Sequence, residues 1–398
     1  MDPLKDGFLD HLAQTSPDPL GLDIVHAEGC WLTDRSGKRY LDLVAGLAVN
    51  NVGHRHPKVV AAIKEQCDKY LHVVPYGEFV QEPQVRFAER LTGVLPNELD
   101  CAYFVNSGTE AVEAALKLAK RVTGRTGLIA CHNSYHGSTH GSLSVTGNET
   151  KKFRSRPLLP DVGFMRYNAM DDLALITERT AGVIVEPVQG DAGVRIPDVK
   201  WMRELRTRCA GTGAQLILDE VQTGFGRTGK LFAFEHFGIV PDILVLGKAL
   251  GGGMPMGAFV ARKDAMRTLT CDPVLGHITT FGGHPIPCVA GHAALDALLD
   301  ENLLDRSMAM GLLFKELLMH RSILELRGTG LMLAVDLGDP ERVQRVVRGC
   351  LEKGVLGFWF LSSPTAFRIA PPLTISKEEV VLACKIILDT LEEVDRQG

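Results

Sequence analysis

The sequence lacks the features that mark nucleic-acid-binding, membrane and disulfide-bonded proteins. Its 48 aspartate and glutamate residues outnumber its 43 lysine and arginine residues, so no basic excess exists to neutralise nucleic-acid phosphates. No apolar run approaches the roughly 20 residues that a bilayer-spanning helix needs. The nine cysteines form no CxxC pair, which removes the usual signal for a zinc site. We therefore expect no nucleic-acid partner, no membrane partner and no metal.

Two further absences concern location and domain structure. Residues 1–19 have no basic region ahead of an apolar core, so no secretory signal is visible and a soluble, cytoplasmic protein is expected. Repeats, low-complexity tracts and Ser/Gly-rich linkers are missing too. Yet 398 residues exceed the size at which a single hydrophobic core stops growing, so two structural lobes are expected.

The pattern along the chain indicates how these lobes are built. Helical and strand patterns alternate from about residue 57 to residue 281, which is typical of an α/β sheet with mainly parallel strands. Residues 20–42 alternate as a small antiparallel sheet would, and a smaller α+β unit follows residue 287. We predict a large α/β domain at residues 57–285 and a small domain assembled from residues 1–56 and 286–398.

Four β-type segments of the large domain end in polar residues. Residues 242–248 end in Lys248, residues 215–219 in Asp219 and residues 183–186 in Glu186, while residues 102–105 run into Asn106-Ser107-Gly108-Thr109. In an open parallel sheet, ligands bind outside the carboxyl ends of the strands. The sequence therefore predicts a catalytic site at this edge, with groups that could hold pyridoxal phosphate.

Lys248 and Asp219 carry the chemistry of this hypothesis. A lysine at the end of an apolar strand has a desolvated stem, which favours the neutral amine that attacks an aldehyde; a lysine that reaches back to solvent is the alternative. The nearby glycines 251–253 allow backbone to approach a ligand. An aspartate ending a buried strand can keep a pyridine nitrogen protonated. The alternatives for Asp219 are a helix N-cap or, together with Glu220, a divalent-metal site.

Two loops supply the remaining groups. Residues 106–110 lie between a strand and a helix predicted over residues 109–121. An anion could bind there, because the start of a helix offers backbone N–H groups, a hydroxyl and the positive end of the helix dipole. An ordinary N-cap is the alternative. Tyr135, which His136 and Gly137 follow, could stack on a pyridine ring, or it could be a core tyrosine.

Residues 224–230, GFGRTGK, imitate a nucleotide-binding loop. Leu231 stands where such a loop needs serine or threonine for magnesium, and the next strand ends in Lys248 instead of an acidic residue. We expect a surface or interface loop. A nucleotide-binding regulator is the alternative function from another class, and a catalytically silent protein is a third.

In combination, the motifs resemble the class III pyridoxal-phosphate aminotransferases of the ornithine, acetylornithine and 4-aminobutyrate group. The likeness runs along nearly the whole chain. Its segments are VGHRHP (52–57), NSGTEA (106–111), EPVQG (186–190), LDEVQTGFGRTG (218–229), GKALGGG (247–253) and FRIAPPL (367–373). It implies the type I fold of these enzymes, with a mainly parallel seven-stranded sheet. It also implies transfer of an amino group from an amino acid or ω-amine to 2-oxoglutarate or pyruvate. Racemases, aminomutases and decarboxylases share the fold and are alternatives.

The resemblance implies a role for individual cofactor-binding residues. Lys248 would bond to the cofactor and then move a proton between substrate and cofactor, while Asp219 would pair with the ring nitrogen and Gln222 with the phenolic oxygen. Tyr135 would stack on the ring. Phosphate would be bound by Ser107, Gly108, Thr109 and, from the neighbouring subunit, Thr280. The protein would therefore be a homodimer with shared active sites.

Arg368 would hold a substrate carboxylate through its bidentate fork. Four further residues are expected on the substrate side of the site: Ser138, Glu186, Asp191 and Thr279. Ser138 departs from the group, which usually has an arginine there that grips a second carboxylate. Pyruvate is therefore a rival to 2-oxoglutarate, unless Arg154 or Arg156 takes over that task.

Two other positions also depart from the group. Asp191 stands where the group often has a glutamate that neutralises the carboxylate-binding arginine, and the shorter acid is expected to pair with Arg368 less well. His284 replaces an asparagine, and no consequence follows from the sequence.

Overall fold

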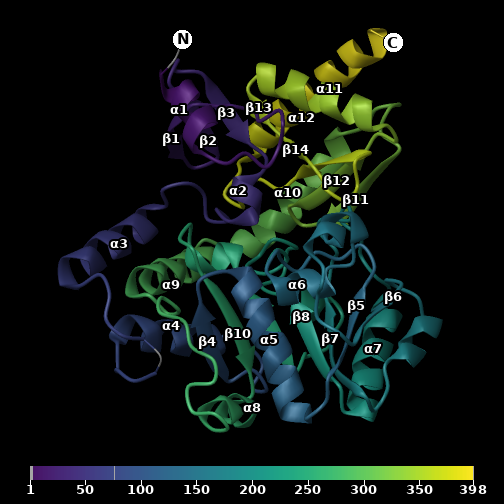
Figure 1. Ribbon diagram of the computed structural model, residues 1–398. Coiled ribbons are helices and arrows are strands. Elements are labelled where there is room, and N and C mark those ends of the chain that lie inside the picture. Colours follow the sequence, from purple (N-terminus) through teal and green to yellow (C-terminus); the bar gives the residue numbers. More distant parts are fainter. Residues whose placement is uncertain (1–2, 76, 398) are drawn as a thin grey trace.

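The computed structural model describes residues 3–75 and 77–397, and a seven-stranded sheet forms its larger part (Figure 1). The strand order is β4-β10-β9-β8-β7-β5-β6. Their bounds are β4 (Cys101–Val105), β5 (Gly127–Cys131), β6 (Val162–Met165), β7 (Thr180–Val185), β8 (Gln215–Asp219), β9 (Ile243–Leu246) and β10 (Gly257–Ala261). Only β10 runs antiparallel to its neighbours; the other pairings are parallel. The predicted mainly parallel sheet is confirmed.

Continuous apolar runs form the central strands because helices cover both faces of this sheet. Every residue of β7, β9 and β10 is buried. The covering helix α5 (Gly108–Thr123) begins at the N-cap Ser107 and ends at Gly124, whose left-handed φ of 68° suits glycine. The helix predicted over residues 109–121 is confirmed, with one or two more residues at each end.

The other helices of this part lie around the same sheet. The α-helices are α3 (Pro57–Lys69), α4 (Glu82–Thr92), α6 (His140–Val145), α7 (Val199–Thr212), α8 (Lys263–Arg267) and α9 (Pro285–Asp300). The 3-10 helices are η1 (Glu149–Lys151), η2 (Phe153–Ser155), η3 (Asp171–Leu175), η4 (Ala233–His236), η5 (Lys248–Gly251) and η6 (Thr268–Thr270).

Two smaller four-stranded sheets lie above the large one. The first has the order β1-β2-β3-β13, with β1 (Ile24–Glu28), β2 (Trp31–Asp34), β3 (Arg39–Asp42) and β13 (Val355–Leu356). The second has the order β11-β12-β15-β14, with β11 (Glu325–Thr329), β12 (Met332–Asp336), β14 (Phe358–Trp359) and β15 (Ala366–Ile369). The expected antiparallel strands within residues 20–42 are confirmed, and β13 joins them in parallel from the far end of the chain.

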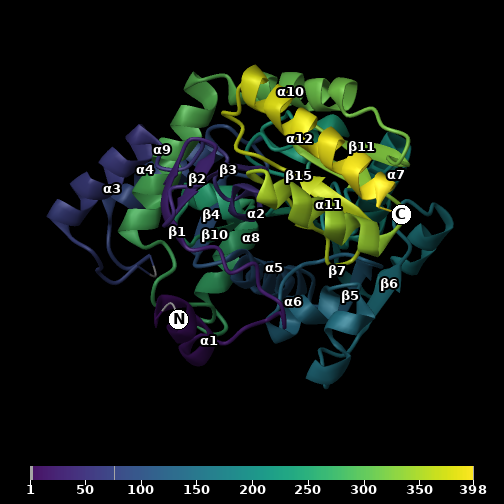
Figure 2. The ribbon, with the colours of Figure 1, turned by 90° about the horizontal axis from the view of Figure 1, so that it is seen from above.

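Helices α10 (Leu303–Leu317), α11 (Pro340–Glu352) and α12 (Lys377–Arg396) pack beside the second small sheet (Figure 2). The pattern Ser376-Lys377-Glu378-Glu379 predicts a capping box at the start of α12, and it is present: Ser376 Oγ accepts from Glu379 N, and Glu379 Oε2 accepts from Ser376 N. Two short elements come from the N-terminal part, α1 (Pro3–His11) and the left-handed turn α2 (Ala45–Ala48). Domain boundaries after residues 56 and 285 remain a proposal. No helix within residues 3–75 and 77–397 has the length and apolar content to cross a bilayer.

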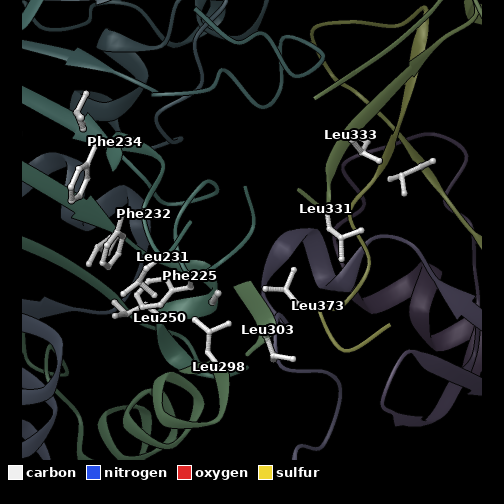
Figure 3. Packing of buried hydrophobic residues seen from close by; sticks show 14 of the residues in the cluster. Phe225, Leu231, Phe232, Phe234, Leu250, Leu298, Leu303, Leu331, Leu333 and Leu373 are labelled. Carbon is white, nitrogen blue, oxygen red and sulfur yellow. The ribbon is translucent and has the colours of Figure 1, made fainter. Parts of the chain in front are cut away.

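Loop 224–230 was expected to be a surface or interface loop; the surface alternative was wrong, because the loop is buried between the large sheet and the second small sheet. Only Lys230 is exposed, whereas Arg227 and Thr228 are completely buried. The loop follows β8 and packs against the second small sheet and its helices. Figure 3 shows Phe225, Leu231 and Leu298 on one side of the shared hydrophobic cluster and Leu331 and Leu373 on the other.

Candidate active site

A cavity of about 260 Å³ lies at the carboxyl edge of the large sheet. Loops after β4, β5, β7, β8 and β9 converge there, because these strands share one direction. The cavity is lined by Gly108, Thr109, Tyr135, His136, Gly137, Ser138, Glu186, Asp191, Asp219, Val221, Gln222 and Lys248. The structure therefore brings together most of the side chains that the sequence placed in one site.

Asp219 is buried at the end of β8, and both of its oxygens are held. Its Oδ2 lies 2.7 Å from His136 Nδ1, and its Oδ1 accepts from Val221 N at 3.1 Å. The His136 ring is buried as well, and its Nε2 has no partner among the described residues. His136 is a functional contact that the sequence analysis missed, since no spacing pattern links positions 136 and 219.

Lys248 follows β9 as the first residue of η5 and takes a left-handed φ of 47°. Such a backbone conformation costs about 1–3 kcal/mol for a residue other than glycine and is found where surrounding structure imposes it. Burial lowers the pKa of Lys248, and the nearby carboxylates of Asp219 and Glu186 oppose this effect. The lysine is thus held in a setting that favours its neutral amine.

The N-terminus of α5 forms the opposite end of the cavity. Ser107 Oγ accepts from Glu110 N as the N-cap, and Thr109 Oγ1 lies 2.6 Å from Ser142 Oγ. A Cβ at Gly108 would meet Val221 Cγ1 at 2.8 Å, so only glycine lets the backbone pass this close to the loop after β8. The remaining N–H groups of the first helical turn can face an anion.

Glu186 holds two of the lining loops together. Its Oε1 accepts from Tyr135 N at 3.0 Å and its Oε2 from Gly190 N at 2.9 Å. Burial raises the pKa of Glu186 to about 7. Tyr135 is 38% exposed, so it is not a core tyrosine, and its hydroxyl lies 3.1 Å from Ser138 Oγ.

Arg368 on β15 approaches the cavity from the second small sheet. Its Nη2 lies 3.7 Å from Asp191 Oδ1, which is an ion-pair distance longer than a hydrogen bond. Asp191 instead accepts from Leu361 N at 3.1 Å and from Ser362 Oγ at 2.7 Å. Burial lowers the pKa of Arg368, and its Nε has no partner among the described residues. This geometry agrees with the weak pairing expected of the shorter acid.

Several residues singled out in the sequence lie apart from this cavity. Thr280 is exposed, and Thr279 Oγ1 accepts from Asn106 Nδ2 at 2.7 Å. Arg154 is exposed over the Phe153 ring, and Arg156 pairs with Glu149 on the surface.

The His284 departure has a structural explanation. Its Nδ1 accepts from Ile286 N at 3.3 Å, so the histidine caps the N-terminus of α9. Asparagine is among the preferred N-cap residues, and the histidine fills the same position.

Comparison with known proteins identifies the family. The sequence matches the aminotransferase class-III family over residues 12–391. It is 43% identical to acetylornithine aminotransferase of Methanosarcina mazei over 377 residues, covering 92% of this chain and 90% of that protein. It is 37% identical to the [LysW]-aminoadipate semialdehyde/glutamate semialdehyde transaminase of Sulfolobus acidocaldarius, covering 95% and 97%. The solved ornithine aminotransferase of Toxoplasma gondii superposes with a TM-score of 0.91 at 30% identity, covering 99% of this chain and 94% of that one.

The chain therefore belongs to the class III aminotransferases, and the family implies pyridoxal phosphate as cofactor. The cavity fits this group. Lys248 offers an amine, the buried Asp219 carboxylate offers a partner for a protonated ring nitrogen, and the α5 N-terminus offers donors for a phosphate. A Cβ at Gly137, at the rim beside Tyr135, would clash with Thr109 Oγ1.

Proposed function

We propose that this aminotransferase takes the terminal amino group of an ω-amino acid and gives it to a 2-oxo acid. The observation that carries this proposal is the pair of basic groups at one cavity, Lys248 at the sheet edge and Arg368 beside Asp191. The cofactor held at Lys248 would receive the substrate amine, and Arg368 would bind the substrate carboxylate. A substrate that bears these two groups at a distance therefore fits between the two positions. Relatives named for acetylornithine support the same class.

The cofactor-facing residues divide the work. When bound, pyridoxal phosphate supplies an electron sink for the charge left on the substrate carbon after a proton is removed. Lys248 Nζ, whose pKa is lowered by burial, would accept that proton. Asp219 keeps a proton on the ring nitrogen, and His136 fixes the orientation of the Asp219 carboxylate.

The other proposed contacts position the ring and its phosphate. Tyr135 and Gln222 both line the cavity, where Tyr135 would cover one face of the ring and Gln222 would hydrogen-bond to its phenolic oxygen. Phosphate is received at the start of α5 by Ser107, Gly108 and Thr109. Glu186 is proposed to act on the substrate side of the site, where it accepts hydrogen bonds from both the Tyr135 loop and the Gly190–Asp191 loop.

The acceptor is proposed to be a small monocarboxylate such as pyruvate. Apart from Lys248, whose amine would bond to the cofactor, no described lysine or arginine lines the cavity, and Arg368 lies next to it. A second substrate carboxylate would face Ser138 and Asp191, and neither is a cation.

The test uses the two half-reactions separately. Purified holoenzyme is mixed with single amino donors, and the visible spectrum reports conversion of the cofactor to its aminated form. The aminated enzyme is then mixed with pyruvate or with 2-oxoglutarate, and the spectrum reports how fast the cofactor is converted back to its original form. An ω-amino acid as the best donor and pyruvate as the better acceptor are expected. Racemisation or decarboxylation without any 2-oxo acid would overturn the proposal.

A Ser138→Arg variant examines the acceptor directly, with Ser138→Gln as its uncharged control of similar reach. The arginine is expected to raise kcat/KM for 2-oxoglutarate relative to pyruvate by about 10-fold or more, as one charged hydrogen bond allows. A wild-type preference for 2-oxoglutarate, unaltered in Ser138→Arg, would show that its second carboxylate is bound elsewhere.

We also propose a homodimer in which Thr280 serves the partner's site. Exposed apolar side chains from residues 71–75, 77–80 and 274–281 form a surface, the edge patch, next to the sheet edge strand β4. Its members are Leu71, Val73, Val74, Phe79, Val80, Val274, Leu275, Ile278 and Phe281. The first and last of these segments touch, since the His72 and Phe281 rings lie 4.9 Å apart. An apolar patch of this kind marks a protein–protein contact, and Thr280 lies within it.

All nine cysteines are free thiols, which supports a reducing, cytoplasmic setting.

A further inference from the structure

Arg227 is a completely buried arginine without an acidic partner. It lies in the loop 224–230, and none of the ion pairs among residues 3–75 and 77–397 includes it. Burial lowers the pKa of Arg227 to about 9. A buried cation is costly unless its donors are satisfied. The Nε of Arg227 has no partner among the described residues, so the contacts of its two terminal nitrogens indicate its task.

Three separate segments accept from the guanidinium. Nη1 donates to Leu331 O at 2.9 Å and to Pro371 O at 2.6 Å, and Nη2 donates to Asn51 Oδ1 at 2.5 Å. The backbone of Arg227 adds a further link, because its carbonyl accepts from Leu331 N at 3.1 Å. Arg227 thus holds the residue before β12 and the segment after β15 to the loop that follows Asp219 and Gln222.

The strand held in this way carries Arg368. Pro371 lies three positions after Arg368, and Arg368 pairs with Ala334 of β12. The guanidinium of Arg368 lies over the Phe360 ring, 4.6 Å from its centroid, but its Nε has no described partner and Asp191 is 3.7 Å away. The place of this guanidinium is therefore set by the backbone of β15 together with the Phe360 ring, and a shift of β15 would move it. A displacement of about 1 Å in a group that positions substrate can cost about 100-fold in rate.

We propose that Arg227 is a positioning residue for carboxylate recognition: it ties the cofactor-side loop after β8 to the strand that carries Arg368. This fixes the distance between the amine-reacting end and the carboxylate-binding end of the cavity. The inference rests on the proposed function, in which Arg368 binds the substrate carboxylate.

The experiment compares two donors that differ in one group, 5-aminopentanoate and pentylamine, in holoenzyme carrying Arg227→Met. The methionine keeps an unbranched stem but donates no hydrogen bonds. We expect kcat/KM for 5-aminopentanoate to fall by about 10-fold or more, mainly through KM, while kcat/KM for pentylamine changes less than about 2-fold. Pentanoate, which carries no amine, reports binding without turnover, and its dissociation constant is expected to rise in parallel.

Two further variants separate positioning from general loss of structure. Asn51→Ala removes one acceptor and leaves Arg227 its two carbonyl partners, so a smaller shift in the same direction is expected even if Arg227→Met fails to fold. Arg208→Met is the matched control: Arg208 Nε also donates to a backbone carbonyl, that of Ile176, but from α7. It is expected to leave the ratio between the two donors unchanged.

The outcomes that overturn this inference are distinct from those that overturn the proposed function. Equal losses for both donors in Arg227→Met and Asn51→Ala, in a wild-type enzyme that prefers 5-aminopentanoate, would overturn the positioning role alone. Unchanged kinetics in both variants would do the same. A wild-type enzyme that treats the two donors alike would remove the carboxylate role of Arg368, and both proposals would fall.

Discussion

Lys248 combines a buried side chain with a left-handed backbone conformation, and both features are unfavourable for a lysine. The surrounding backbone is tightly packed and holds this conformation in place. Gly247 and Gly108 approach so closely that a Cβ at position 247 would lie 3.1 Å from the Gly108 Cα. The first residue-scale prediction is that Lys248→Ala folds but shows no turnover, measured by steady-state kinetics beside a thermal melt. The exposed Lys200→Ala on α7 serves as control. Turnover in the alanine variant would remove Lys248 from the mechanism.

The Asp219 carboxylate is expected to act through its negative charge. Asp219→Asn retains an oxygen for Val221 N but carries no negative charge with which to stabilise a positive ring nitrogen. We predict a loss of about 100-fold or more in kcat, in the range found when one preorganised charge-stabilising contact is removed. Stopped-flow half-reactions measure it, with the exposed Asp264→Asn as control. Near-normal rates would show that Asp219 has only a structural role.

At the scale of one element, Glu220 directly follows β8 and holds the start of η4. Its Oε2 accepts from Ala233 N at 2.7 Å, and its Oε1 accepts from Phe234 N at 2.8 Å. Burial raises the pKa of Glu220 from 4.5 to about 7, although these donors oppose the shift. Between the two values the folded protein keeps a proton that the unfolded chain has released. The free energy of unfolding should therefore fall as the pH rises from about 4.5 to about 7.

A shift of about 2.5 pH units corresponds to at most about 3 kcal/mol. Glu220→Gln cannot ionise, so its free energy of unfolding should depend less steeply on pH, as measured by denaturant unfolding at pH 5, 6 and 7. Glu186 shifts in the same direction, so part of the slope should remain. An identical slope in wild type and Glu220→Gln would contradict the raised pKa.

At the scale of the whole molecule, the shared-site dimer makes a prediction that a single chain cannot satisfy. Lys248→Ala lacks the amine, and Thr280→Asp places a negative charge where a phosphate is expected. Mixed after denaturation and refolding, the two inactive variants should regain activity, because one site of each heterodimer then has Lys248 from one subunit and Thr280 from the other. A site built within one chain would stay inactive. Size-exclusion chromatography with light scattering measures the oligomer in parallel.

Local patterns explain why much of this structure could be predicted from sequence. The helix at residues 109–121 and the capping box at Ser376 depend on neighbours within a few positions, and both are present. The convergence of Lys248, Asp219 and Glu186 followed from a rule about sheet edges that needs only strand order and direction. Such features are encoded within single segments.

The remaining features depend on segments far apart in the chain. The contact between His136 and Asp219 joins the ends of different strands, and the left-handed φ of Lys248 occurs where the adjacent Gly247 packs against Gly108 of another loop. Loop 224–230 was expected at a surface or interface because Leu231 and Lys248 exclude a nucleotide-binding loop, and the sequence around it shows no partner that would bury it. The acceptors that bury Arg227 come from residues more than 100 positions later, at Leu331 and Pro371.

Strand β13 completes the N-terminal sheet from the other end of the chain: Leu41 pairs with Val355, and 355 − 41 = 314 positions separate them. All seven strands of the large sheet lie between residues 101 and 261, so that sheet can form before β13, β15 and Arg368 have left the ribosome. The half of the cleft that holds the cofactor is therefore synthesised, and free to fold, before the half that recognises the substrate carboxylate. A nascent chain of this enzyme would gain cofactor affinity first and substrate selectivity last.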